Sequence, residues 1–244
     1  MNLILTMAGK YSSFKGEGFT IPKFLLPWGD RSILSEILKE MSPHFKNIYL
    51  IANKNDEDFM IHVENIMNVY NIDLENLILI QDTSSQSETL YEGLGLIENI
   101  KGSIIVHNID TILYNRNYKE IESSLLKNDG FVDIFNSNNP NYSYVLLEDT
   151  KIIEIIEKTL ISDIATSGMY GFSSAKIFKK YYVNGYISSV YKKMIIDNLS
   201  IVIGTNYSES NTIVLGTPDE YINLSKLKLT RKRWYEKYSF HNGY

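Results

Sequence analysis

Four short apolar runs, separated by stretches with helical spacing, lie within the first 108 residues and restrict the folds open to this chain. They occupy 1–7, 47–53, 76–81 and 102–108, and they are rich in leucine and isoleucine with little polar alternation. Such runs are typical of strands covered on both faces. Repeated β-α units predict a parallel sheet with right-handed crossovers. The expected helices lie at 32–41, 57–70 and 87–99.

After about residue 128 the pattern is typical of antiparallel strands joined by short turns rich in asparagine and aspartate. We therefore expect one α/β domain over residues 1–244, with a Rossmann-like, mostly parallel sheet flanked by helices and a small β-rich inserted lobe. A final helix is expected to start at Thr217-Pro218 and to end in a solvated basic segment, 226–238. The other expected strands lie at 130–135, 142–149, 151–158, 165–172 and 200–205, and the other helices near 174–182 and 187–198.

Composition excludes several classes of function. The formal charge of −5 argues against nucleic acid or an anionic membrane surface as the main partner. The absence of cysteine rules out disulfides and thiolate metal sites. No stretch approaches the ~20 apolar residues of a membrane span. We expect a soluble, cytoplasmic protein and leave open whether it forms a homo-oligomer.

A polar loop rich in glycine and lysine follows the first expected strand, at 7–27. In open α/β sheets, ligands bind beyond the carboxyl ends of the strands. Backbone N–H groups of a glycine-rich loop can hold an anion, and lysines add positive charge. The loop therefore suits a triphosphate. Because loops of this composition are common on surfaces, an ordinary surface loop is the alternative.

The order of residues within this loop favours the first interpretation. Met7-Ala8-Gly9, Ser12-Ser13-Phe14, Gly18-Phe19 and Ile21-Pro22-Lys23 follow one another. This order resembles the signature of the sugar-phosphate nucleotidyltransferases, in particular the branch common in bacterial capsule and surface-polysaccharide clusters. The resemblance implies that the loop wraps nucleotide phosphates, that Lys23 contacts them, and that Met7, Ala8, Gly9, Lys10, Ser12 and Ser13 bind nucleotide.

Two residues of the loop depart from the family pattern. Ser13 replaces an arginine and Tyr11 replaces a glycine. Arginine commonly neutralises charge on a departing pyrophosphate, so its loss removes a large electrostatic contribution. Lys10 or Lys15 could supply charge, although lysine lacks the bidentate fork of arginine.

A second matching segment follows the third expected strand. Residues 85–89 resemble the family's base-binding loop, with serine in place of glycine and of alanine. Ser85, with Glu88 three residues later, also forms the pattern of a helix capping box, and both interpretations are compatible. The resemblance implies that Gln81, Ser85, Gln86 and Ser87 hold the base.

Asp110 follows the fourth expected strand. A carboxylate at this place can hold Mg²⁺ that bridges triphosphate oxygens, whereas an isolated aspartate more often forms a turn. Its position resembles that of the family's metal-binding aspartate, which implies a metal role. Relatives carry a second metal carboxylate where this chain has Val214. We do not expect a histidine ligand, and we assign Asn108 to the acceptor side.

The last matching segment contains Glu157 and Lys158, followed by a strand with Gly168. In the family, the corresponding residues face the second substrate, so the resemblance implies that Lys158 contacts the acceptor phosphate. A solvated turn at Glu157-Lys158 is the alternative. The residues expected to bind the acceptor are Asn108, Glu157, Lys158, Thr166, Ser167 and Gly168.

Together the resemblance implies a nucleotidyltransferase of the pyrophosphorylase or cytidylyltransferase type. It would use Mg²⁺ and an NTP, with a pyrimidine such as CTP favoured. The NMP would pass to a sugar 1-phosphate or another small phosphorylated acceptor in capsule or surface-polysaccharide biosynthesis, with release of pyrophosphate. Lys23, Asp110 and Lys158 are the expected catalytic residues. Residues 1–127 would bind nucleotide, and 128–244 would bind the acceptor and end in the C-terminal helix.

Two other hypotheses remain open. The loss of the arginine at Ser13 and of the carboxylate at Val214 is compatible with a nucleotide-binding or regulatory relative that no longer catalyses. A nucleotide-sugar glycosyltransferase would require a D-x-D motif, and Asn108-Ile109-Asp110 contains only its second acid.

Overall fold

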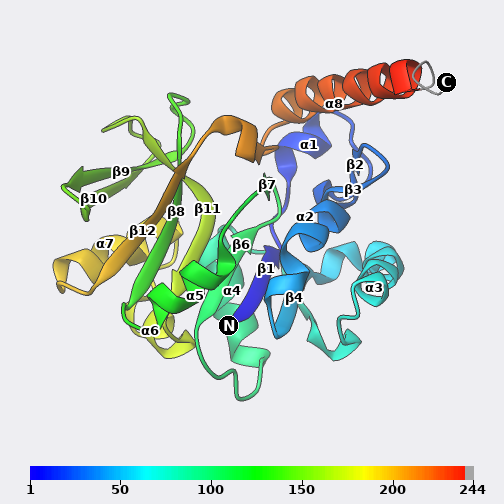
Figure 1. Cartoon of the computed structure of the whole chain (residues 1–244). Coiled ribbons are helices and arrows are strands. Elements are labelled where there is room, and N and C mark those ends of the chain that lie inside the picture. Colours follow the sequence, from blue (N-terminus) through cyan, green and yellow to red (C-terminus); the bar gives the residue numbers. More distant parts are fainter. Residues whose placement is uncertain (240–244) are drawn as a thin grey trace.

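The apolar runs of the first half form four adjacent parallel strands on one side of the sheet, as predicted (Figure 1). The structure is a computed structural model that describes the backbone of residues 1–239 and the side chains of 1–205 and 207–228. β1 (Asn2–Met7) pairs in parallel with β4 (Asn47–Asn53) and β6 (Ile104–Asn108), and β4 pairs in parallel with β5 (Leu77–Ile80). Every residue of β1 is buried, so both faces are covered.

The two faces of β1 pack against different hydrophobic clusters. Leu3 and Leu5 point into one cluster, whereas Ile4 points into the other. This alternation follows from the two-residue period of a strand. Helices cover both faces: α2 (Ile33–Met41), α3 (Met60–Val69), α4 (Gln86–Leu96) and α5 (Tyr118–Leu125).

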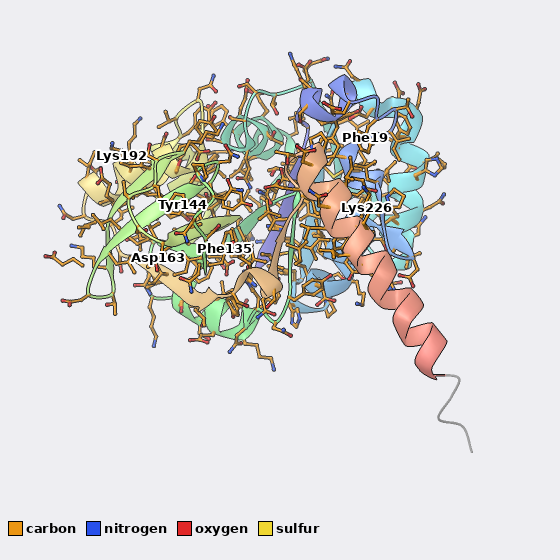
Figure 2. All side chains as sticks on the ribbon, turned by 90° about the horizontal axis from the view of Figure 1, so that it is seen from above. Phe19, Phe135, Tyr144, Asp163, Lys192 and Lys226 are labelled. Atoms are coloured by element: carbon orange, nitrogen blue, oxygen red, sulfur yellow. The ribbon has the colours of Figure 1, made fainter. Side chains whose placement is uncertain are left out.

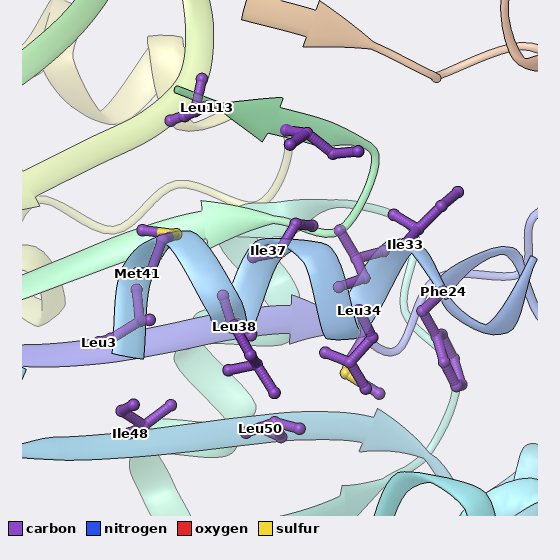
Figure 3. Close-up of a cluster of buried hydrophobic side chains, with 14 of the residues drawn as sticks. Leu3, Phe24, Ile33, Leu34, Ile37, Leu38, Met41, Ile48, Leu50 and Leu113 are labelled. Carbon is purple, nitrogen blue, oxygen red and sulfur yellow. The ribbon is translucent and has the colours of Figure 1, made fainter. Parts of the chain in front are cut away.

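α2 shows why these segments become helices. The side chain of Ser32 accepts the backbone N–H of Ser35 and caps its first turn. Leu34 and Leu38 point toward Ile48 and Leu50 of β4, whereas Ile37 lies on the side of the helix that faces Leu113 (Figure 3). The helix expected at 57–70 begins later than predicted, at Met60, because a 3₁₀ segment (Lys54–Phe59) precedes it.

The later strands continue the same sheet. Within the described backbone, nine strands belong to it. α6 (Ala175–Tyr181) and α7 (Ile187–Ile196) both pack into the hydrophobic cluster that contains Ile4, on the same face as α4. The antiparallel style predicted for this half is found in the pairing of β11 with β6 and of β9 with β10. The strands are β8 (Gly130–Asn136), β9 (Ser143–Glu148), β10 (Lys151–Glu157), β11 (Ile164–Phe172) and β12 (Ile201–Tyr207).

β11 changes its neighbours along its length. At 170–172 it lies between β6 and β8, whereas Ala165 lies between β8 and β9. The register with β8 shifts between Thr166 and Tyr170, around Gly168 at φ +86°. The sheet therefore forks at the carboxyl end of β6, where an α/β sheet usually places its ligand.

The loop predicted at 7–27 contains more regular structure than expected. It includes the short helix α1 (Ser12–Gly16), a 3₁₀ turn (Lys23–Leu25) and β2 (Pro27–Trp28), which pairs with β3 (Arg31–Ser32). Phe14 is fully buried and packs against Phe19 and against Tyr221 of α8 (Pro218–Ser239). This long-range apolar anchor stabilises a helix too short to produce a periodic pattern.

α8 lies beside the N-terminal half, with Phe19 close to its first turn (Figure 2). The basic end expected at 226–238 has described side chains only as far as Lys228, and the rest lie outside the described residues. No helix among the described residues is long and apolar enough to cross a membrane. A second small sheet pairs β7 (Thr111–Leu113) with β13 (Thr212–Val214), and further 3₁₀ turns lie at Ser42–His44, Leu74–Asn76 and Glu209–Asn211.

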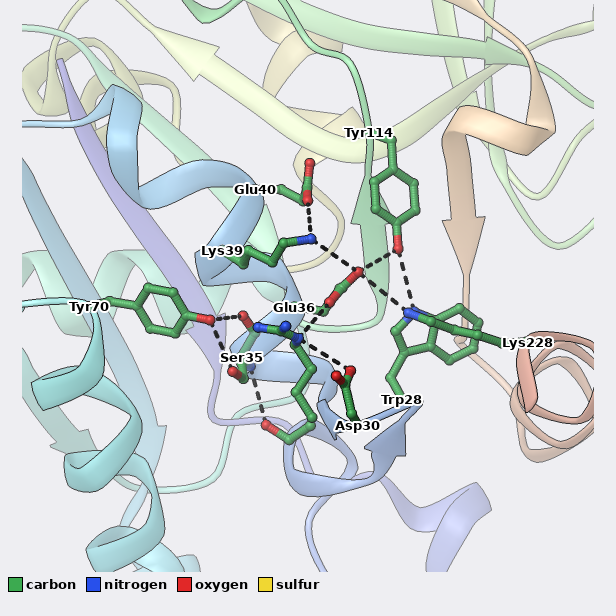
Figure 4. Close-up of polar contacts among 11 residues, drawn as sticks. Trp28, Asp30, Ser35, Glu36, Lys39, Glu40, Tyr70, Tyr114 and Lys228 are labelled. Atoms are coloured by element: carbon green, nitrogen blue, oxygen red, sulfur yellow. Dashed lines mark hydrogen bonds and ion pairs between the residues drawn. The ribbon is translucent and has the colours of Figure 1, made fainter. Parts of the chain in front are cut away.

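Two polar clusters join distant segments. Glu36 of α2 accepts the hydroxyl of Tyr114 at 2.9 Å and contacts Arg31 and Lys228 at 3.4 Å (Figure 4). Glu36 thus connects α2 to the segment after β7 and to α8. The second cluster contains the buried ion pair of Arg116 and Asp133.

Arg116 and Asp133 form an ion pair shielded from water. Their side chains are 0% and 1% exposed, and Nη2 lies 2.8 Å from Oδ2. The guanidinium also donates to Thr212 and to backbone carbonyls, and it stacks 3.9 Å from the ring centroid of Tyr207. The pair therefore joins the start of α5, β8, β12 and β13 within the core.

Candidate functional site

Two pockets lie side by side at the carboxyl ends of β1 and β6. The first, of about 400 Å³, is lined by the loop after β1 and is called the loop pocket. The second, of about 510 Å³, is lined by the forked part of β11 and by β9, β10 and β13, and is called the fork pocket. Ser85, Gln86, Asn108 and Asp110 line both pockets, so a ligand in one can approach a ligand in the other.

Lys23 and Asp110 face each other where the pockets meet. Lys23, the first residue of the 3₁₀ turn, places its Nζ atom 3.0 Å from Oδ2 of Asp110 and 3.4 Å from the carbonyl oxygen of Gly216. Burial alone would raise the pKa of Asp110, but the Lys23 ammonium outweighs it and the pKa is lowered. Asp110 is therefore ionised at neutral pH.

The turn that carries Asp110 is braced from two sides. The N–H of Leu215 donates to the carbonyl of Asp110 at 2.6 Å, so the residue directly after β13 holds the turn. Beneath it, Nε2 of the fully buried His107 lies 2.8 Å from the carbonyl of Thr111. That carbonyl can only accept, so Nε2 carries the proton. Burial lowers the pKa of His107 to about 4, so the imidazole is neutral.

His107 should therefore make stability depend on pH. Its pKa falls from 6.5 to about 4 in the fold, so the unfolded chain binds this proton more readily. The contribution of the neutral imidazole to the free energy of unfolding is fully present above about pH 6.5. About 3 kcal/mol of it is lost as the pH falls to about 4. We expect urea unfolding of His107→Gln to show a correspondingly smaller loss between pH 7 and 4. Parallel curves for both proteins would contradict this assignment.

Lys158 lies at the rim of the fork pocket. Its Nζ atom donates to the hydroxyl of Tyr186 at 3.2 Å, and this hydrogen bond raises the pKa of Lys158. Its neighbour Glu157 accepts the hydroxyls of Ser143 and Ser188. The ammonium of Lys158 and the hydrogen-bonding carboxylate of Glu157 thus line the same pocket. This combination suits a ligand with both phosphate and hydroxyl groups.

Gly168 lines the fork pocket beside Gln86 and Asn108, which line both pockets. A Cβ atom there would lie 2.1 Å from Nδ2 of Asn108, so only glycine fits against this side chain. Gln86 donates to the carbonyl of Gly168 at 3.0 Å and fixes the bulge of β11 from the other side. Oδ1 of Asn108 is shielded from water and has no partner among the described residues.

The structure brings most of the predicted site residues together. Ser85 caps α4 by accepting the N–H of Glu88, as predicted, but the Glu88 carboxylate returns to the N–H of Ser84. Lys10 lines the loop pocket and pairs with Asp82 at 2.7 Å. The predicted residues that line one pocket are Met7, Gly9, Lys10, Ser12 and Lys23 in the loop pocket, and Glu157, Lys158, Thr166, Ser167 and Gly168 in the fork pocket.

Four predicted residues line neither pocket. Ala8 is buried, and its carbonyl accepts the N–H of Thr83. Ser87 is buried in the first turn of α4, where its hydroxyl donates to the carbonyl of Val183. Ser13 and Gln81 are exposed on the surface outside both pockets.

The fork pocket also contains residues that were not predicted, among them Tyr186 and Glu220. Glu220 accepts the N–H of Thr217 and the hydroxyl of Tyr142. Its place in a Thr-Pro-Asp-Glu helix start could have identified it, because a capping carboxylate lies at a fixed spacing. Tyr186 carries no such signal. Val214 lines the same pocket and leaves the wall beside Asp110 apolar.

The side chains around Asp110 can be compared with the ligands that a magnesium ion takes in nucleotide sites. Among the described residues, no group of three or more His, Cys, Asp or Glu side chains could hold a metal. Mg²⁺ in nucleotide sites usually takes one or two carboxylates together with phosphate oxygens and water. Asp110 fits that role, so the residues suit a magnesium ion carried by a nucleotide rather than a preformed metal cage.

The comparison with curated proteins found a relative that matches most of this chain. No protein-family model matches the chain. The bifunctional protein GlmU of Methanococcus aeolicus is 28% identical over 182 residues, which cover 73% of this chain. The chain spans about two fifths, 41%, of the length of that relative.

Solved structures share most of the architecture. The nucleoside-diphosphate-sugar pyrophosphorylase of Vibrio cholerae superposes with a TM-score of 0.79 at 24% identity, over 92% of this chain and 99% of that protein. A UDP-glucose pyrophosphorylase complexed with UDP-glucose superposes with a TM-score of 0.72 at 17% identity, over 94% and 98%. The chain therefore has the fold of the nucleotide-sugar pyrophosphorylases.

Proposed function

We propose that this chain transfers an NMP from an NTP to a sugar 1-phosphate or another small phosphorylated acceptor, releasing pyrophosphate. The observation that carries the proposal is the meeting of two pockets at Asp110. Lys23 stands on the side of the loop pocket and Lys158 on the side of the fork pocket. An NTP in the first pocket and a phosphorylated acceptor in the second would each meet a cation.

The arrangement requires no nucleophile from the protein. An oxygen of the acceptor phosphate forms a bond to the α-phosphorus, and the bond to the bridging oxygen breaks. Pyrophosphate leaves with the electron pair of that bond. Lys23 would neutralise charge on the triphosphate, and Lys158 would orient the attacking phosphate. Positioning and charge stabilisation account for most catalysis in such transfers.

Asp110 would hold Mg²⁺ together with the phosphates. When bound, the ion would neutralise negative charge on the phosphate oxygens. The low pKa of Asp110 keeps its carboxylate available at neutral pH.

The names of similar proteins support the class of reaction. Two solved structures of this fold are described as pyrophosphorylases for nucleotide sugars. A pyrimidine base, CTP in particular, and a role in capsule or surface-polysaccharide biosynthesis are proposed from the loop sequence alone.

The first test of this function is calorimetric titration with ATP, CTP, GTP, UTP and dTTP in Mg²⁺. We expect one triphosphate to bind most tightly and Asp110→Ala to weaken that binding. If none binds the folded protein, the loop pocket is not a nucleotide site and the proposed function is wrong.

A nucleotide-binding protein without catalytic activity is the second candidate. Ser13 lies outside both pockets, and Val214 supplies no ligand beside Asp110. This candidate predicts tight binding of one triphosphate without pyrophosphate release for any phosphorylated acceptor.

Val214→Asp should strengthen the metal site. β13 pairs Val214 opposite Thr111, the residue after Asp110, so a carboxylate there would face the same junction. A second negative ligand should tighten Mg²⁺ binding to the nucleotide-bound protein by about tenfold. Val214→Asn provides the uncharged control. Equal Mg²⁺ affinities for the two variants, measured by titration, would show that position 214 does not face the metal.

A further inference from the structure

Tyr11 adopts a backbone conformation that its side chain disfavours. Its φ and ψ are 39° and 43°, in the left-handed region that glycine adopts most readily. It precedes the first turn of α1, but its side chain makes no capping hydrogen bond there. Such conformations persist where surrounding contacts hold them, and they cluster at functional sites.

The Tyr11 side chain is anchored to a buried carboxylate. Its hydroxyl donates to Oδ1 of Asp56, which is only 3% exposed, in the 3₁₀ segment after β4. The other oxygen, Oδ2, is shielded and has no hydrogen-bond partner among the described residues. The ammonium of Lys15 lies 4.5 Å from the centroid of the Tyr11 ring. The ring is thus held from two directions.

This anchor connects the loop pocket to a segment outside it. Tyr11 lines the pocket together with Gly9, Lys10 and Ser12. The segment Lys54–Phe59 contributes no residue to either pocket. A buried carboxylate needs its hydrogen bond more than an exposed one, because water cannot replace the lost donor. The pair should therefore resist rearrangement of the loop.

We infer that Tyr11 and Asp56 are positioning residues that hold the loop at 8–13 in one conformation before nucleotide binds. The inference rests on the proposed function, because the loop would cradle the triphosphate. A segment ordered in advance loses less conformational freedom on binding, so its ligand binds more tightly. Neither residue takes part in the transfer itself. Their loss should therefore weaken nucleotide binding and leave turnover at saturation nearly unchanged.

The test compares Tyr11→Phe with the native protein and with Tyr91→Phe. Tyr91 is 39% exposed and stacks on Tyr182 away from both pockets, so its variant is a matched control. We expect Tyr11→Phe to raise the Kd of the preferred triphosphate about tenfold, since one hydrogen bond to a charged group is lost. Amide hydrogen exchange over 8–13 should become faster by about the same factor. The kcat for pyrophosphate release should change less than about twofold.

A pair of variants at Asp56 provides a second measurement. Asparagine still offers an oxygen to the Tyr11 hydroxyl, whereas alanine does not. Asp56→Asn should therefore keep most of the nucleotide affinity that Asp56→Ala loses. If Tyr11→Phe lowers the Tm but changes neither the Kd of the triphosphate nor amide hydrogen exchange over 8–13, the pair is only a structural contact and the inference is overturned.

Failure of the inference can be distinguished from failure of the proposed function. If the native protein binds a triphosphate and Tyr11→Phe binds it equally well, the positioning role is wrong and the proposed function stands. If the native protein binds none of the five triphosphates, the proposed function fails. The positioning role toward nucleotide then fails with it, whatever the exchange rates show.

Discussion

Replacing Asp110 by asparagine is expected to lower kcat for pyrophosphate release by at least about 100-fold, because the carboxylate would hold the Mg²⁺ whose charge stabilises the transition state. The carboxylate contacts Lys23 at 3.0 Å and lines both pockets, so its loss affects the charge balance where donor and acceptor meet. Asparagine preserves the shape of the side chain. Steady-state assays of pyrophosphate release provide the measurement.

Two further variants sharpen this prediction. Asp163→Asn removes an exposed carboxylate outside both pockets and should change kcat less than about threefold. Lys23→Met should cause a loss similar to that of Asp110→Asn. Because the two side chains contact each other, the double variant should lose less than the sum of the two effects. An Asp110→Asn protein that retains normal kcat would contradict the assigned role.

Arg116→Met should produce the largest loss of stability, about 3–5 kcal/mol. The substitution leaves the carboxylate of Asp133, with its side chain only 1% exposed, buried without its cation. Burial already raises the pKa of Asp133 even though Arg116 opposes this effect. Without Arg116 the carboxyl group should bind a proton at still higher pH, so the deficit should shrink as the pH is lowered. Urea unfolding at several pH values measures both effects.

An exposed ion pair gives the control for this prediction. Lys39 lies 3.1 Å from Glu40 and its side chain is 46% exposed. Lys39→Met should change the free energy of unfolding by less than about 0.5 kcal/mol. The double variant Arg116→Met/Asp133→Leu should be more stable than Arg116→Met, because no unpaired charge remains buried. Equal losses in the free energy of unfolding for Arg116→Met and Lys39→Met would show that the buried ion pair is no more important for stability than the exposed one.

The parts of the fold that the sequence predicts well are those with strong local patterns. β1 is buried on both faces, and its apolar run alone indicates a central strand. Because β1 and β6 are parallel neighbours, their carboxyl ends meet, so Lys23 and Asp110 could be expected to lie together. Their approach in space agrees with the prediction, whereas their chemical roles stay predictions.

The parts that the sequence predicts poorly depend on distant contacts. β7 and β13 are three residues each, lie about 100 residues apart in the chain, and within the described backbone pair only with one another. α1 depends on the burial of Phe14 against α8. Such elements have no periodic signal of their own.

Distant contacts also decide which of the predicted site residues line a pocket. Gln81 and Ser87 match the family pattern in sequence order, but the end of β5 and the first turn of α4 direct them away from both pockets. Tyr186 enters the fork pocket from the segment before α7, which a local pattern cannot place near Lys158. Pocket walls built from several segments therefore require the tertiary structure.

The central claim is tested most directly by exchange of labelled pyrophosphate into the preferred triphosphate, with and without phosphorylated acceptors. Because the acceptor itself attacks the α-phosphorus, label should enter the triphosphate only when both the triphosphate and one suitable acceptor, such as a sugar 1-phosphate, are present. The Asp110→Asn protein should show almost none. Exchange without any acceptor would reveal a covalent NMP–protein intermediate and contradict the proposed mechanism. No exchange with any acceptor, from a protein that still binds its triphosphate, would contradict catalysis and identify a nucleotide-binding protein.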